Sequence, residues 1–257
     1  MPPIRKGDGT PVTPKGISQI RTGDGRILFD GVALPDSDLY QKVVTRWSFT
    51  EGSGTNVEDS EGSLDADFTG LDWGSGGVGG FYGILDGSDD AADLGSDSRT
   101  AFNHFFNDNV GGIGGWVKPD DVELQAVIAN GASTSDRVFI CGFLDGDWFF
   151  RFGSTGVDII TGSPSADTWQ AFVITFDGDE ATLYDAEASD SSMSVVGSDS
   201  ASTDSGDLQS HDVHIGTEPG EENRYYGGGL DEVWNADEHV TESEIQEWFD
   251  DTKELYD

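Results

Sequence analysis

The densest group of carboxylates among aromatic residues lies in GGGLDEVWNADEHVTESEIQEWF, residues 227–249. Two carboxylates about 5 Å apart could act as the nucleophile and the acid–base group of a retaining glycoside hydrolase. Asp231 and Glu232 are adjacent in a predicted strand, where neighbouring side chains point to opposite faces. We therefore expect that they cannot act on one sugar together, and we predict no catalytic residue.

The other acids of this stretch fall in a predicted helix that begins after Thr241. Thr241 is a favourable N-cap, and Glu244 three residues later completes a capping box. Ile245, Trp248 and Phe249 recur at helical spacing on one face. The helix therefore explains Glu244 by capping, and its apolar face is expected to dock on the edge of the main fold.

Nucleophilic and phosphate chemistry have little support. Cys141 is the only cysteine, and its apolar neighbours indicate a buried strand thiol. His211 and His214 point to opposite faces of a strand, so they are not expected to bind a metal together. The segment GSGGVGG (74–80) precedes no predicted helix, which favours a flexible surface loop over a phosphate-binding loop.

Calcium binding is a further possibility, because turns rich in aspartate supply the six to eight oxygens that Ca²⁺ requires. The candidate ligands are Asp86, Asp89 and Asp90 in LDGSDD, and Asp231 in GGLDEVW. In a chain this acidic, such clusters also arise by chance. Asp231 could instead accept backbone N–H groups of a turn, or pair with Arg46 or Arg224.

Sugar binding would require aromatic rings that can stack on pyranose faces. Four aromatic residues in or beside predicted loops are candidates: Trp73, Trp148, Tyr225 and Tyr226. The alternative for each is a place in the core, where most aromatic residues of a β-sandwich lie.

The charge is extreme and unevenly spread. Residues 1–46 carry seven basic and five acidic residues (net +2), whereas residues 47–257 carry six basic and 45 acidic residues (net −39). Such a surface repels itself unless concentrated salt screens it, which favours adaptation to high salt; an ordinary acidic secreted protein is the alternative. A surface of this charge excludes nucleic acid as a partner.

Short apolar runs separated by Gly/Asp/Ser turns extend from Val43 onward. The predicted strands cover residues 43–49, 112–117, 124–130, 137–144, 147–153, 157–161, 169–176, 180–186, 212–216 and 229–235. Strands at this spacing predict an all-β fold, an antiparallel β-sandwich or jelly roll with a short C-terminal helix. We assign this domain to residues 41–257.

Residues 1–40 form a separate, proline-rich, extended N-terminal arm. Its apolar residues Ile17, Ile20, Ile27 and Phe29 argue against full disorder and predict contact with the domain or with other chains. The arm is therefore expected to anchor the protein or to form a homo-oligomer. The sequence has no apolar h-region near its start and no 18-residue apolar run, so we expect neither a signal peptide nor membrane insertion.

Several motifs, in order, resemble the laminin G-like, concanavalin A-like lectin/glucanase jelly rolls over residues 43–249. They are RWSFTEGSGTNVEDSEG (46–62), VGGFYGILDGSDDAADLG (78–95), GIGGWVKPDD (112–121), DTWQAFVITFDGDEATLYDA (167–186) and the final strand with its helix. The resemblance implies the concanavalin A-like fold. Calcium at the sandwich rim is common in such modules. Glucanases of the fold carry Glu-x-Asp-x-Glu or Glu-x-Asp-x-x-Glu on a concave-face strand, and the only near match here, at 242–247, falls on the predicted helix.

The arm, in KGISQIRTGDGRILFDGVALPDS, resembles N-terminal segments of structural proteins from haloarchaeal viruses. The arm, the absence of a signal peptide and the salt-adapted surface together predict a non-enzymatic virion protein, exposed on capsid or tail, that attaches to host glycans. It would assemble in a high-salt archaeal cytoplasm and reach the exterior within the virion. A cell-surface or secreted carbohydrate-binding module is the alternative, and a glycoside hydrolase is less favoured.

Overall fold

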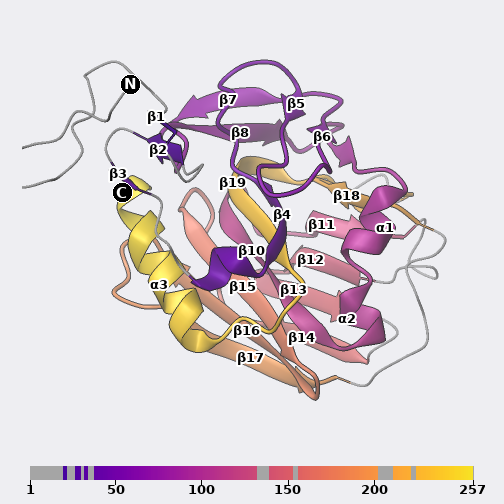
Figure 1. The fold of residues 1–257 in the computed structure, drawn as a ribbon. Helices are drawn as coiled ribbons and strands as arrows, with labels where there is room; N and C mark the ends of the chain where they lie inside the picture. The colour runs from indigo at the N-terminus through magenta and orange to yellow at the C-terminus, as the bar shows by residue number, and fades with distance from the viewer. Residues whose placement is uncertain are drawn as a thin grey trace, which may run out of the picture.

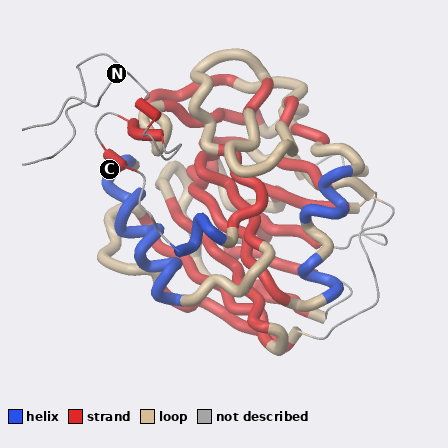
Figure 2. The backbone as a smooth tube through the Cα atoms, viewed as in Figure 1, coloured by secondary structure: helices blue, strands red, loops and turns tan. Residues whose placement is uncertain are grey.

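Two antiparallel β-sheets stack face to face in the computed structural model (Figure 1). The structure describes residues 20–21, 27–29, 32–33, 38–131, 139–152, 156–201, 211–220 and 224–256. Strands dominate this part of the chain, and the helices lie at the outside of the sandwich (Figure 2). The predicted all-β sandwich with a short C-terminal helix is confirmed.

The larger sheet has the order β17-β16-β15-β10-β19-β8-β7, and β4 also pairs with β19. Its strands are β4 (Val43–Trp47), β7 (Asp72–Ser75), β8 (Phe81–Asp86), β10 (Val110–Pro119), β15 (Gln170–Asp177), β16 (Glu180–Glu187), β17 (Ser194–Ser200) and β19 (Gly227–Ala236). Strand β19 is thus central, because β10, β8 and β4 all pair with it.

The smaller sheet has the order β14-β13-β12-β11-β18-β9. Its strands are β9 (Ala92–Asp93), β11 (Gln125–Asn130), β12 (Phe139–Leu144), β13 (Asp147–Phe152), β14 (Val157–Thr161) and β18 (Val213–Ile215). A two-stranded ribbon of β5 (Asn56–Val57) and β6 (Ala66–Asp67) and two short helices, α1 (Asp97–Ala101) and α2 (His104–Asn107), complete this part of the fold.

The main core fills the space between the sheets. Alternation along β15 places Phe172 and Ile174 in this core, where Phe172 packs 5.6 Å from Trp148 of the smaller sheet. The side chains between them face the other way, and Val173 lies in a second apolar cluster on the outer face of the larger sheet. Both faces of β15 are apolar because both are covered.

Helix α3 (Glu242–Thr252) covers that outer face, together with the 3-10 turns η1 (Asp38–Gln41) and η2 (Lys253–Leu255). Phe249 of α3 stacks on Trp116 of β10 at 5.6 Å, and Trp248 meets the edge of Trp234 of β19 at 5.7 Å. The predicted capping box is confirmed: Thr241 accepts the Glu244 N–H, and the Glu244 side chain accepts the Thr241 N–H. No helix in the described part of the chain is long and apolar enough to span a membrane.

The arm contains more strand than the sequence suggested. The apolar run at 26–34 predicts one strand or hairpin limb, whereas three short strands form an antiparallel sheet, β1 (Ile20–Arg21), β2 (Ile27–Phe29) and β3 (Val32–Ala33). Ile20 pairs with Leu28, whereas Ile17 lies outside the described residues. The assembly role of Ile17, Ile20, Ile27 and Phe29 stays a prediction.

Candidate functional site

A β-bulge in β19 determines where the two adjacent acids point. Trp116 of β10 pairs with Asp231 and Gly114 pairs with Trp234, so two residues of β19 lie opposite the single Gly115. Glu232, one of the two, has a positive φ of 49°. The expected alternation therefore fails here. Both acids face the outer layer, and Val233 returns to the core.

Asp231 is fully buried (0% exposed) and accepts three hydrogen bonds. The Tyr256 hydroxyl donates to Oδ2 at 2.7 Å and the Val78 N–H donates to the same oxygen at 2.9 Å. The Glu232 N–H donates to Oδ1 at 2.8 Å. Burial, followed by the charge of Glu232, raises the pKa of Asp231 well above its usual value. Asp231 thus ties the central strand to residue 78 and to the turn after α3.

Glu232 is equally buried (0% exposed) and forms a two-pronged ion pair with Arg46 of β4. Arg46 Nε and Nη2 each lie 2.9 Å from a different carboxylate oxygen of Glu232. The guanidinium lies 4.3 Å from the ring centre of Tyr40, and burial raises the pKa of the Tyr40 hydroxyl. We call Tyr40, Arg46, Asp231, Glu232 and Tyr256 the buried acid cluster.

This cluster has the residue types of a catalytic site but not the access. Its two carboxylates are sealed beneath α3, η1 and the 74–80 segment, so no substrate in solvent reaches them in this arrangement. The arrangement joins β4, β19 and the chain after α3. The sequence left open whether Asp231 would accept turn N–H groups or pair with an arginine, and the first alternative holds.

The glycine-rich segment 74–80 packs directly against Asp231 of the buried acid cluster. A Cβ at Gly77 would lie 2.2 Å from Asp231 Oδ2, and Gly77 has a φ of +77°. The neighbouring Val78 is buried in the outer cluster. The expected surface loop is therefore a packed cover over Asp231, and it requires glycine at the point of closest approach.

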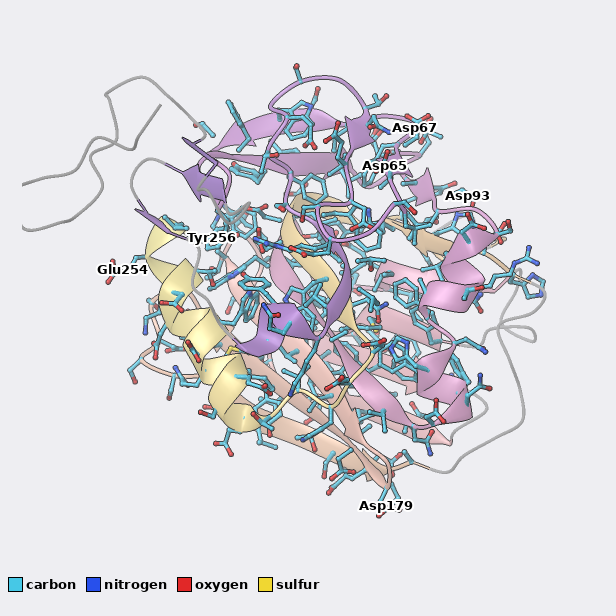
Figure 3. All side chains as sticks on the ribbon, in the orientation of Figure 1. Asp65, Asp67, Asp93, Asp179, Glu254 and Tyr256 are labelled. Carbon is cyan, nitrogen blue, oxygen red and sulfur yellow. The ribbon has the colours of Figure 1, made fainter. Side chains whose placement is uncertain are left out.

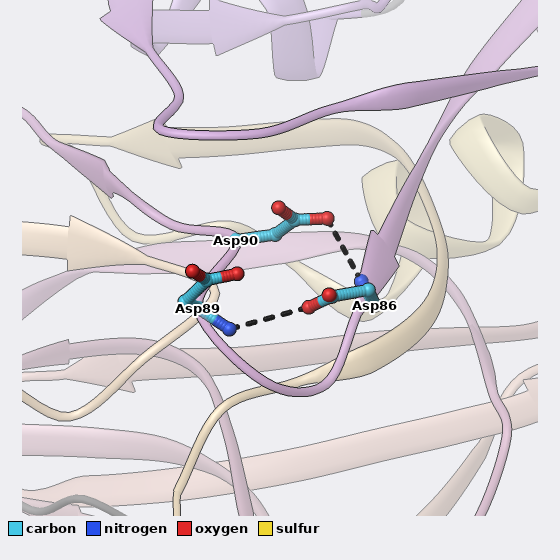
Figure 4. Close-up of side chains that lie close together, drawn as sticks. All are labelled: Asp86, Asp89 and Asp90. Atoms are coloured by element: carbon cyan, nitrogen blue, oxygen red, sulfur yellow. Dashed lines mark hydrogen bonds between the residues drawn. The ribbon is translucent and has the colours of Figure 1, made fainter.

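Asp86, Asp89 and Asp90 lie together on an exposed turn after β8, with one oxygen of each within 4.8 Å of the others (Figure 4). Asp86 Oδ1 accepts the N–H groups of Ser88 and Asp89, and these bonds lower the pKa of Asp86. Asp90 Oδ2 accepts the Asp86 N–H at 3.0 Å. The carboxylates thus shape the turn itself, and calcium binding here stays a prediction.

Asp231, the remaining candidate ligand, does not lie with this group. Its oxygens are bonded beneath the 74–80 segment, whereas the Asp86 turn is exposed. The two positions also differ along β19, because Asp86 pairs with Gly227 at the start of that strand, four residues before Asp231.

Two of the four predicted stacking residues are corrected by their burial. Trp148 (0% exposed) lies in the main core, and Tyr226 (0% exposed) lies there too, with its hydroxyl bonded to the Gly229 carbonyl. Trp73 and Tyr225 are half-buried, and the Trp73 indole donates to the Gly54 carbonyl. Phe81, which the sequence analysis did not select, is more exposed (37%) than any of the four.

A cavity of about 440 Å³ opens at one end of the sandwich. It is lined by Gly162, Ser163, Gln170, Asp185, Ala186, Glu187, Asp190 and Val196, and we call it the acidic cleft. Trp148 lies beside it, because the indole N–H donates to Asp185 Oδ2 at 2.8 Å. Burial, the charge of Asp190 and the charge of Glu187 raise the pKa of Asp185.

Sequence reasoning missed this cleft, although a signal exists. Along β16, Ala181 and Leu183 point into the core, and the next two inward positions are the acids Asp185 and Glu187. A switch from apolar to acidic residues on the buried face of a strand marks the point where the core ends and a polar opening begins.

Comparison with protein families accounts for this architecture. A laminin G-type family model, described as the concanavalin A-like lectin/glucanases superfamily, matches residues 86–246. The chain belongs to the concanavalin A-like lectin/glucanase superfamily. No curated protein sequence matches the chain.

Solved structures agree with the superfamily fold. Domain 4 of AbnA, a GH43 extracellular arabinanase from Geobacillus stearothermophilus solved with arabinotriose, has a TM-score of 0.56 at 16% identity, covering 80% of this chain and 98% of that domain. Trypanosoma rangeli sialidase with 2,3-difluorosialic acid has a TM-score of 0.61 at 15% identity, covering 93% of this chain and 35% of the sialidase. This chain thus spans about a third of the sialidase, and at these identities the likeness is one of fold.

The outer face of the larger sheet is covered in this chain. Trp116 and Trp234 of that face pack under α3. The Glu242–Glu247 segment, which is the near match to a glucanase motif, lies in α3 itself, as the sequence predicted. The described polar opening is instead at the end of the sandwich.

Proposed function

We propose that this superfamily member is a non-enzymatic adhesive protein that binds carbohydrate through its jelly roll. The observation that carries the proposal is the sealed pair Asp231 and Glu232, whose carboxylates are used in packing. The superfamily includes both lectins and glucanases, and the arabinanase domain with arabinotriose is a bound-sugar example of the same fold. Binding without hydrolysis is the function this arrangement supports best.

We further propose that the protein is a structural component of a haloarchaeal virion, exposed on capsid or tail and attached to other virion proteins through residues 1–40. The charge contrast between residues 1–46 and 47–257 supports two different tasks for the two parts of the chain. In this proposal the protein assembles in a high-salt cytoplasm and meets host glycans outside the cell. A cell-surface or secreted carbohydrate-binding module is the second candidate.

Solution mass in molar KCl tests the role of the arm. We expect the full chain to be oligomeric and a chain that starts at Leu39 to be monomeric. If both are monomers, the assembly role of the arm fails and the free carbohydrate-binding module becomes the better proposal.

Incubating the full chain with host-envelope glycans separates binding from hydrolysis. We expect retention without sugar release, and release of sugar by the full chain would overturn the non-enzymatic proposal.

Dilution from molar KCl is expected to lower the melting temperature of the full chain. Its acids, such as Asp179 and Glu254 at the outline of the molecule (Figure 3), repel one another when salt no longer screens them. Thermal unfolding monitored by circular dichroism in dilute buffer and in 3 M KCl measures this. An equal melting temperature in the two solutions would contradict salt adaptation.

A further inference from the structure

The acidic cleft is built from residues that point between the two sheets. Gln170 precedes Phe172 by two positions on β15, and Asp185 lies directly opposite Phe172 on β16. Glu187 lies opposite Gln170. Because Phe172 faces the main core, these three polar side chains continue the buried face of the sheet to its end. The cleft therefore lies where the apolar core ends, and its polar lining continues the inward-facing row of side chains. Trp148 of the core contacts this lining through Asp185.

Hydrogen bonds hold the lining residues in place. Trp148 donates to Asp185 Oδ2, and the Ser165 hydroxyl donates to Glu187 Oε1 at 2.9 Å. Gln170 Nε2 donates to the Ser165 carbonyl at 2.7 Å. These contacts fix the side chains before any ligand arrives, which reduces the entropy lost on binding.

Acceptor atoms remain for a ligand. Gln170 lines the cleft and is only 2% exposed, and within the described chain its side-chain hydrogen bond uses Nε2 and leaves Oε1 without a donor. Asp185 Oδ1 is likewise without a partner among the described residues, since the bond from Trp148 goes to Oδ2. Neither oxygen is among the described buried side-chain atoms that are sealed without a partner, so a ligand that enters the cleft can donate to them. The free polar atoms of the cleft are acceptors, so a ligand that carries hydrogen-bond donors fits it.

The spacing and the volume favour a ligand larger than an ion. Among the described residues, the acids whose ligand atoms all lie within 4.8 Å of one another are Asp86, Asp89 and Asp90, and the cleft acids are not such a group. A cavity of about 440 Å³ falls in the range of small-molecule sites. The geometry therefore fits a molecule that presents several donors over its surface, as a polyhydroxylated sugar does.

The charge of the cleft restricts that sugar. Asp185, Glu187 and Asp190 form no ion pair with any described cation, and the nearby Lys253 bonds to Asp250 and to the backbone carbonyls of Asp190 and Ser191. Three uncompensated carboxylates repel an acidic ligand and attract a cationic one. Hydroxyl and ammonium groups suit this lining, whereas a sugar carboxylate does not.

We propose that the acidic cleft is a carbohydrate subsite for neutral or amino sugars, in which ligand donors bond to Asp185 and Gln170, and that it rejects acidic sugars. This inference rests on the proposed carbohydrate-binding function and names the site and ligand class. It assigns Trp148 a different role from the stacking platform expected from the sequence, because Trp148 positions Asp185 by its indole N–H.

The test uses the full chain in molar KCl, with calorimetric titration of matched monosaccharides. The probes are glucose, galactose and mannose, their 2-amino forms and their uronic acids. We expect at least one neutral or amino form to bind, and its uronic acid to bind at least tenfold more weakly. Asp185→Asn and Gln170→Ala are each expected to weaken binding about tenfold or more, which corresponds to about 1.4 kcal/mol.

The matched control is Asp179→Asn, an exposed acid in the turn at the opposite end of the same β15–β16 hairpin, which should leave binding unchanged. Equal melting temperatures of the variants in the same KCl solution show that each one folds. Sugar binding that survives both cleft variants, or tighter binding of a uronic acid, overturns the cleft proposal while the carbohydrate-binding function stands. If no monosaccharide and no host-envelope glycan binds, both proposals fail.

Discussion

Replacing Arg46 with methionine is expected to lower the free energy of unfolding by about 3–5 kcal/mol, because it leaves a buried carboxylate without its partner. Glu232 is fully buried, and both of its oxygens bond to the Arg46 guanidinium. Methionine keeps much of the apolar length of arginine, so the loss reports the charge. Urea denaturation of the full chain in molar KCl measures it.

A matched control is Arg151→Met. Arg151 pairs with Asp158 at 2.7 Å, but both side chains are well exposed, and such pairs contribute little. We expect a change below about 1 kcal/mol. The double variant Arg46→Met/Glu232→Gln should recover part of the loss, since it also removes the buried charge. A loss at Arg46 no larger than that at Arg151 would show that the buried pair does not hold the fold together.

Replacing Gly77 with alanine is the second change with a large expected effect, a loss of about 3 kcal/mol or more in the free energy of unfolding. The new Cβ would lie 2.2 Å from Asp231 Oδ2. The segment must move away, and the fully buried Asp231 then loses the bond from the Val78 N–H. A buried carboxyl group that loses a donor, together with the strain of moving the segment, accounts for a loss of this size.

Gly80→Ala is the matched control, because it adds backbone strain without a steric clash with Asp231. Gly80 has a φ of +86°, similar to +77° at Gly77, but a Cβ there would meet nothing within 4 Å. Left-handed strain alone, about 1–2 kcal/mol, is therefore expected at Gly80. Denaturation of the two variants side by side gives the difference. Equal losses would mean that close approach to Asp231 is unimportant.

Much of the fold follows from sequence pattern. Period-two alternation and Asp-Gly turns locate most core strands; the predicted 169–176 and 180–186, for example, correspond to β15 and β16. Strand β17 escapes prediction because SVVGSDS is half-exposed at the sheet edge, so the core does not impose an apolar pattern on it. Helices α1 and α2 are too short for a helical period to show.

The buried acid cluster escapes sequence reasoning for a different reason. Alternation in a strand assumes regular register, and a single bulge at Glu232 reverses it. The partners Arg46 and Tyr256 lie far from Asp231 and Glu232 in sequence, so only the tertiary fold brings them together. Trp148 shows the same limit. Its place beside a predicted turn suggested exposure, whereas its inward register on β13 places it in the core.

The central position of β19 also sets the order in which the chain can fold. Strands β4, β8 and β10 are synthesised long before Gly227–Ala236, and each uses β19 as a neighbour. Until β19 is made, these strands keep unpaired backbone edges that are open to other chains. Closure of the larger sheet joins residues nearly two hundred positions apart, which makes folding slow. A nascent chain of this protein therefore passes through a long aggregation-prone interval, in which protection by chaperones would have its greatest effect.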